Sequence, residues 1–152
     1  MKDYSEQRII IDEVIGEMQK KDIDLYLIIT AEGCDPMTGF IPGVDTVGSG
    51  AFMFAADGRR LATASSIDAQ DVEESGLFDE VVRYEGFDET VAKMVRGLAP
   101  KRIALDFSDK VDYCDGLTLG TYQRFLDALG DYAFEAVSAD EIVPQVRARH
   151  EA

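Results

Sequence analysis

The chain has 152 residues and carries 30 acidic against 15 basic side chains, a formal net charge of −15. This charge disfavours nucleic acid and anionic membrane surfaces as partners, because Lys and Arg supply most of the affinity for both. Hydrophobic residues make up 46% of the chain, enough for a core, and no apolar run approaches the roughly 20 residues of a membrane span. The length predicts one domain, and the acidic, polar N-terminus is unlike a signal peptide, so we expect a cytoplasmic protein.

The first two predicted elements are an amphipathic helix and a buried strand. Apolar residues recur at helical spacing over 6–21, and Asp3 with Glu6 suggests a capping box at its start. The run Leu25–Thr30 is continuously apolar up to its last residue and contains two β-branched isoleucines. This pattern is typical of a central strand that is buried on both faces.

A glycine- and proline-rich segment follows the strand over residues 31–47 and predicts a long loop without regular structure. Loops of this length in compact domains tend to carry function. Beyond it, 48–56 and 60–65 read as two strands, and Asp57-Gly58 between them is a strong hairpin signal. One strand of the sheet is therefore expected to be antiparallel.

Helices and strands alternate through the remaining chain, which predicts an α/β fold with a mixed sheet. We expect Asp88 and Thr118 to cap two of the helices, and Pro144 to leave the last helix short or kinked and frayed beyond Val146. The predicted elements are a short, solvated acidic helix at 68–75, a strand at 79–84, a helix at 88–98, a strand at 102–107, a polar loop at 108–116, a helix at 118–129, a strand at 132–137 and a final helix from Ser138.

Common catalytic and nucleotide-binding patterns are missing. The glycines after the first strand match neither a P-loop nor GxGxxG. Cys34 and Cys114 lie far apart and predict free thiols, and the only histidine, His150, is at the end of the chain. We therefore expect no nucleophile–base pair and no zinc site within this chain.

Four aspartates cluster near the end of the 102–107 strand: Asp106, Asp109, Asp112 and Asp115. Carboxylates at a strand end can hold divalent metal, which leaves a metal-dependent nuclease as one hypothesis. The strong negative charge opposes a polyanionic substrate, so we favour a solvated loop with turn-forming and capping aspartates.

The order and spacing of several sequence blocks resemble the N-terminal domain of the creatinase, prolidase and Xaa-Pro aminopeptidase family of "pita-bread" metalloenzymes. The blocks include RIIIDEVIGEMQKKDID, AEGCDPMTGF, GSGAFMFAADGRRLATAS and VSADEIVPQVRARH. The block DGLTLGTYQRFLDAL is similar to one found in an Xaa-Pro aminopeptidase-like subgroup. The resemblance covers nearly the whole chain.

The resemblance implies a three-layer α/β/α fold with a mixed sheet, ribonuclease H-like in outline. It also implies a domain at residues 1–146 and, at 147–152, the start of a linker to a catalytic domain. Two Asp, one His and two Glu of that domain would hold two divalent metals (Mn, Co or Zn), and none of these ligands can be placed on this chain. The implied partners are the chain's own catalytic domain and a second subunit in a homodimer.

In this family the N-terminal domain typically forms a wall of the active-site entrance. The resemblance implies this role for the loop after the first strand, at Asp35, Met37, Thr38, Gly39 and Phe40. Many members have an Asn-x-x-Tyr-x-x-Gly pattern before the corresponding Gly-Phe, whereas Asp35-Pro36-Met37 stands here. The resemblance implies a non-catalytic domain of an Xaa-Pro peptidase. The alternative is a free-standing binding module without peptidase activity, whose 31–47 loop docks a protein or a small ligand.

Overall fold

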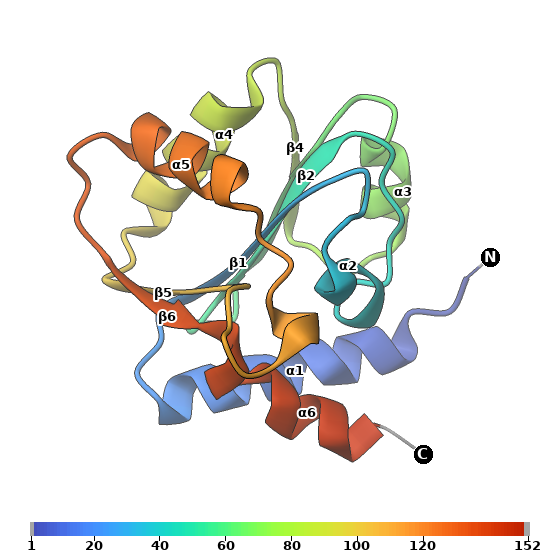
Figure 1. The fold of residues 1–152 in the computed structure, drawn as a ribbon. Helices are drawn as coiled ribbons and strands as arrows, with labels where there is room; N and C mark the ends of the chain where they lie inside the picture. The colour runs from blue at the N-terminus through green and yellow to red at the C-terminus, as the bar shows by residue number, and fades with distance from the viewer. Residues whose placement is uncertain (1, 151–152) are drawn as a thin grey trace.

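A computed structural model describes residues 2–150 and places six strands in one mixed sheet (Figure 1). The order across the sheet is β4-β3-β2-β1-β5-β6. The strands are Leu25–Ala31 (β1), Ser49–Ala55 (β2), Arg60–Ala64 (β3), Glu80–Arg83 (β4), Arg102–Leu105 (β5) and Glu135–Ser138 (β6).

Strand β1 lies in the interior of the sheet, as its apolar run predicts. It pairs antiparallel with β2, Leu25 opposite Ala55, and parallel with β5, Tyr26 opposite Ala104. Six of its seven residues are buried. The Asp57-Gly58 turn joins β2 to β3 in the predicted hairpin, and Gly58 takes the positive φ of 99° that such turns require.

Six α-helices and two short 3₁₀ helices complete the described part of the chain, residues 2–150. The α-helices are Ser5–Lys20 (α1), Pro36–Phe40 (α2), Ala69–Glu74 (α3), Phe87–Leu98 (α4), Leu119–Leu129 (α5) and Val143–His150 (α6). The 3₁₀ helices are Asp112–Cys114 (η1) and Ala139–Glu141 (η2). The three-layer α/β/α architecture with a mixed sheet is thereby confirmed.

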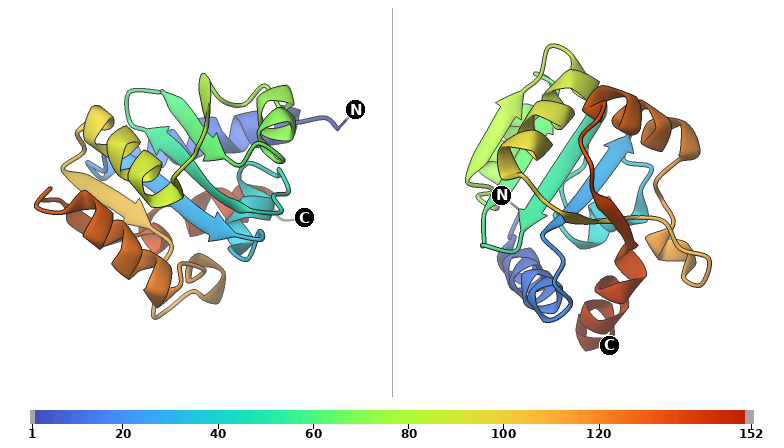
Figure 2. Two further views of the ribbon diagram at one scale, coloured as in Figure 1. Left: turned by 90° about the horizontal axis from the view of Figure 1, so that it is seen from above. Right: turned by 90° about the vertical axis from the view of Figure 1, so that its left-hand side faces the viewer.

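The two faces of the sheet carry separate cores because alternate residues of a strand point to opposite sides. Leu25, Leu27 and Ile29 of β1 pack beneath α4 and α5. Tyr26 and Ile28 point the other way, into a core closed by α1, α2, α3 and α6. Figure 2 shows α4 and α5 on one side of the sheet and α1 and α6 on the other.

Two predicted helix caps are wrong in detail. Helix α1 begins after Tyr4, while the Asp3 side chain accepts a hydrogen bond from the Ser5 amide at 2.9 Å. Helix α4 begins after Gly86, so Asp88 lies in its first turn, where the helix dipole favours a carboxylate. The Glu89 carboxylate occupies the space that a side chain on Gly86 would need. Thr118 caps α5 as predicted.

Three further expectations are corrected. The 31–47 loop contains a short helix, α2, and α6 continues to His150 instead of fraying beyond Val146. Helix α3 is more than a solvated connection, since Ala69 and Val72 are fully buried.

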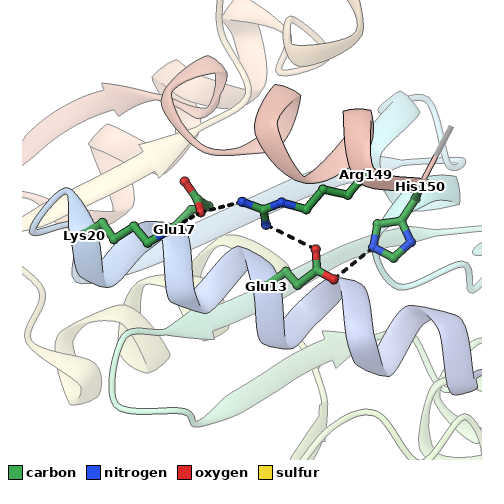
Figure 3. Close-up of polar contacts among 5 residues, drawn as sticks. All are labelled: Glu13, Glu17, Lys20, Arg149 and His150. Atoms are coloured by element: carbon green, nitrogen blue, oxygen red, sulfur yellow. Dashed lines mark hydrogen bonds and ion pairs between the residues drawn. The ribbon is translucent and has the colours of Figure 1, made fainter.

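The end of α6 is held to α1 by a charged cluster (Figure 3). Arg149 donates to Glu13 at 3.2 Å and to Glu17 at 3.0 Å, and His150 lies 3.2 Å from Glu13. Lys20 also donates to Glu17. Hydrogen bonds from Arg149 and Lys20 hold the pKa of Glu17 below its usual value. This cluster holds residues 149 and 150 against α1, whereas positions 151 and 152 of the predicted linker lie outside the described residues.

No helix within residues 2–150 is both long and apolar enough to cross a membrane.

Candidate functional site

The 31–47 loop leaves the end of β1 and is ordered by hydrogen bonds of its own. Asp35 caps α2 by accepting from the Met37 amide at 2.9 Å, and the Asp35 amide donates to the Thr30 hydroxyl at 3.2 Å. Glu32 and Gly33, between β1 and α2, both have positive φ. The loop therefore forms a defined turn and a short helix at the end of β1.

The residues predicted to wall an entrance divide into two groups. Asp35, Met37 and Thr38 are buried, with 1%, 1% and 3% of their surface exposed. Phe40 is half-buried and Gly39 is exposed. The first three thus shape the loop mainly from within, and the last two are the more exposed.

A concave pocket of about 450 Å³ opens on this loop. It is lined by Glu32, Gly33, Asp35, Pro36, Thr38, Gly39, Asp45 and Thr46. Sequence reasoning missed the part of this lining outside 35–40. The signal available in the sequence was the pair of acidic residues near the two ends of the glycine- and proline-rich segment, Glu32 and Asp45.

Beneath the pocket, two buried carboxyl groups meet. Asp106, at the end of β5, accepts a hydrogen bond from the Tyr26 hydroxyl at 2.6 Å. The Asp35 and Asp106 side chains lie close enough to shift each other's pKa through a hydrogen-bonding contact. Two carboxylates have only acceptors, so this contact requires a proton on one of them. Asp35 Oδ2 and Asp106 Oδ2 have no other donor among the described residues, which fits a proton shared between the two groups.

The environment of the pair favours the protonated form of both carboxyl groups. Burial raises the pKa of Asp106 well above its ordinary value, and the adjacent Asp35 raises it further, while the Tyr26 hydroxyl opposes the shift. Burial also raises the pKa of Asp35, against hydrogen bonds from Asp106 and the Met37 amide that favour its ionised form. The two groups therefore titrate as a unit and share a proton.

The pair also raises the pKa of the groups that face it. Burial raises the pKa of Tyr26 well above its ordinary value, and the neighbouring Asp106 and Asp35 raise it further. The buried thiol of Cys114 has its pKa raised to about 12, by burial first and then by Asp106, Asp140 and Asp35, against Arg147. Such a thiol stays protonated at neutral pH and is a poor nucleophile.

Gly116, in the loop after β5, lies directly against Asp35 of the buried Asp35–Asp106 dyad. A Cβ at this position would lie 2.6 Å from Asp35 Cγ and 2.8 Å from Pro36 Cδ. The backbone of this loop therefore approaches the start of α2 more closely than any larger residue allows. In this way the loops after β1 and β5 are locked together at one edge of the sheet.

The far end of the 31–47 loop is held by another buried carboxylate. Asp68, 3% exposed, accepts from the amides of Val47 and Gly48 at 2.9 Å each and from the Ser65 hydroxyl at 3.1 Å. These bonds fasten the loop to the start of α3. The pocket is thus supported at both ends by buried acidic side chains.

The aspartate cluster after β5 does not assemble as a nuclease would need. Asp106 points into the core and is 1% exposed, and Asp115 accepts a hydrogen bond from the Ser108 amide at 3.0 Å. Asp109 and Asp112 are exposed. Within residues 2–150, no group of three or more His, Cys, Asp or Glu side chains is placed to hold a metal ion. The described residues therefore do not fit a dinuclear metal site.

The architecture is that of an α/β domain with a mixed sheet between two helical layers and an acidic pocket at the end of β1. Residues 11–149 match the family model described as "Creatinase/Prolidase N-terminal domain". The chain belongs to this family. No match is found among curated proteins.

Solved structures with the same fold include longer peptidase chains and an isolated N-terminal domain. An X-Pro aminopeptidase from Thermotoga maritima is 21% identical, with a TM-score of 0.72 over 90% of this chain and 35% of that one. An Xaa-Pro dipeptidase from Bacillus anthracis is 18% identical, with a TM-score of 0.70 over 93% of this chain and 36% of that one. The N-terminal domain of the cytoplasmic peptidase PepQ from Mycobacterium tuberculosis is 16% identical, with a TM-score of 0.69 over 91% and 98%.

The chain thus spans about a third of the length of the two longer peptidases that it resembles. At these identities the likeness concerns the fold.

Proposed function

We propose that the chain is the non-catalytic N-terminal domain of a dinuclear-metal peptidase that acts on Xaa-Pro peptides. The observation that carries this proposal is the family match over residues 11–149. Its extent supports the proposal further, since the domain corresponds to only 35–36% of the Thermotoga and Bacillus peptidases. The two metals, Mn, Co or Zn, would be bound by the catalytic domain.

The 31–47 loop would serve as a wall of the active-site entrance. Its pocket is concave and acidic, and the loop is held at both ends by Asp35 and Asp68. Gly39 and Phe40 would present the surface nearest to a substrate, with Asp35, Met37 and Thr38 supporting them from within. A rigid support of this kind suits positioning more than chemistry, because the loop contains no paired nucleophile and base.

An exposed apolar groove supports the proposed contacts with a catalytic domain or a second subunit. It measures about 310 Å³ and is lined by Phe107, Leu117, Leu119, Tyr122 and Ala136. Leu119 is 72% exposed. Large exposed apolar side chains gathered around one groove are typical of surfaces that pack against another domain or subunit. We place the protein in the cytoplasm, as for the PepQ peptidase.

A free-standing binding module is the second candidate. The observation that favours it is the pocket itself, which is formed entirely by one loop of this chain. Such a module would use the pocket without any catalytic domain in the same gene.

The reading frame beyond Ala152 separates the two candidates. We expect it to continue for about another domain or more, on the scale of 100–200 residues, and to encode two Asp, one His and two Glu as metal ligands. A stop codon directly after Ala152 would favour the free-standing module and contradict the proposed peptidase.

A further inference from the structure

We propose that the pocket on the 31–47 loop binds a primary ammonium group, either of a small amine or of a peptide amino terminus. This inference rests on the proposed role of the loop as a ligand-facing wall. It names the chemistry that the wall would recognise.

The first observation is the charge of the lining. Glu32 and Asp45 are exposed carboxylates on the pocket, and Asp35 lies at its buried side. None of the described residues that line it is a lysine, arginine or histidine. Lys2 borders a neighbouring pocket that shares Asp45, but that pocket also contains Asp71 and Glu74. The potential in the pocket is therefore negative, which attracts cations.

The second observation is a pair of buried hydroxyl groups without partners. Thr38 and Thr46 line the pocket and are only 3% and 7% exposed. Their Oγ1 atoms have no hydrogen-bond partner among the described residues. Most buried side-chain polar atoms in folded proteins have a partner, so two unpaired hydroxyls in one pocket point to a ligand that completes them.

An ammonium group matches this set of acceptors. It carries three N–H donors, no acceptor and a positive charge, whereas carboxylates only accept and hydroxyls can accept. A bare metal ion fits less well, because no three metal-binding side chains are arranged around a common point within residues 2–150. The volume of about 450 Å³ also leaves room for the organic part of a small molecule.

Replacing either threonine by valine should leave stability unchanged or raised but weaken binding. Thr38→Val and Thr46→Val keep the shape of the side chain and remove a hydroxyl that the free protein leaves unpaired. Each variant should therefore be at least as stable as the parent to urea. Each should also bind an ammonium probe at least about tenfold more weakly, because a hydrogen bond to a charged donor is lost.

The test is a titration of the 152-residue chain, followed through its backbone amide NMR signals. n-Butylammonium is compared with n-butanol, which has no charge, and with n-butyltrimethylammonium, which has the charge but no N–H donor. The dipeptide Ala-Pro and its N-acetylated form distinguish a peptide amino terminus from a small amine. We expect saturable shifts at Gly33, Gly39 and Thr46 with n-butylammonium, and much smaller ones with its two analogues.

A charge-matched control identifies the carboxylates that matter. Glu32→Gln with Asp45→Asn should weaken n-butylammonium binding at least about tenfold, as expected for the loss of charged hydrogen bonds. Glu80→Gln with Asp131→Asn changes the net charge equally at exposed positions outside the pocket and should have little effect.

Equal shifts with n-butyltrimethylammonium, equal weakening by the control pair, or no saturable shift at all would overturn the proposal. So would a loss of stability in both valine variants, because the hydroxyls would then have partners within the protein. None of these outcomes depends on peptidase activity or on the reading frame, so the binding site and the proposed function can fail separately.

Discussion

Replacing Gly116 by alanine is expected to destabilise the fold by about 3 kcal/mol, the upper part of the usual range for overpacking a buried site. The added Cβ would overlap Asp35 Cγ, at 2.6 Å, and Pro36 Cδ, at 2.8 Å. Neither atom is the far end of a flexible chain. Asp35 is fixed by its cap on α2 and by Asp106, and the Pro36 ring is fixed by its backbone. Relief therefore requires the loops after β1 and β5 to separate.

Urea unfolding of the two proteins measures this effect, with Gly97→Ala as the matched control. Gly97 lies in α4 with no atom within 4 Å of an added Cβ, so alanine there should stabilise the helix by about 1 kcal/mol. If Gly116→Ala lowers the free energy of unfolding and Gly97→Ala raises it, the destabilisation arises from the contact of Gly116 with Asp35 and Pro36. A Gly116→Ala protein as stable as the parent would show that the two loops are not held in close contact.

Asp106→Asn is expected to remove a pH dependence of stability that the buried dyad creates. The folded-state pKa of Asp106 is raised well above 3.8 by burial and by Asp35. Between pH 3.8 and the raised value, the folded chain holds a proton that the unfolded chain has released. Stability is therefore full below the unfolded-state pKa and is lost as pH rises through this window, with a slope of up to about 1.4 kcal/mol per pH unit for one proton.

The asparagine amide supplies the same hydrogen bond without a titrating proton. Its N–H can donate to Asp35, while its oxygen still accepts from the Tyr26 hydroxyl. The variant and the parent should thus be similarly stable near pH 4, and the variant should gain relative to the parent as pH rises. Groups such as Glu17, whose lowered pKa makes stability rise with pH, contribute equally to both proteins and cancel in the difference.

Urea unfolding at several pH values tests this prediction, with Asp109→Asn as a control that removes one exposed carboxylate. The control should follow the parent at every pH. A constant difference between Asp106→Asn and the parent across the range would mean that the dyad holds no shared proton.

Local sequence signals predicted the sheet well because they act over a few residues. The apolar run at Leu25–Thr30 identified a strand buried on both faces, and Asp57-Gly58 identified the hairpin. Helix ends were less predictable. Asp88 has the side chain of a good cap, but the backbone becomes extended at Gly86, where the Glu89 carboxylate needs the free space.

The candidate site depended on contacts between distant segments, which spacing along the chain does not reveal. From the sequence, Asp106 was one of four aspartates expected in a solvated loop. Alternate residues along β5 face opposite sides of the sheet, so Asp106, which follows the strand directly, points inward, towards Tyr26 and Asp35. A tyrosine inside a buried strand was the available signal, because its hydroxyl must find a partner. Helix α2 was missed since its five residues include both a proline and a glycine, which here lie at the first turn and near the end.

We propose that this domain supports a peptidase without performing its chemistry. The most direct measurement is a peptidase assay of the 152-residue chain on Xaa-Pro peptides, with and without added Mn²⁺. We expect no turnover in either case, because the described residues provide no metal-binding set and the Cys114 thiol is held protonated. Robust metal-dependent turnover by this chain alone would contradict it.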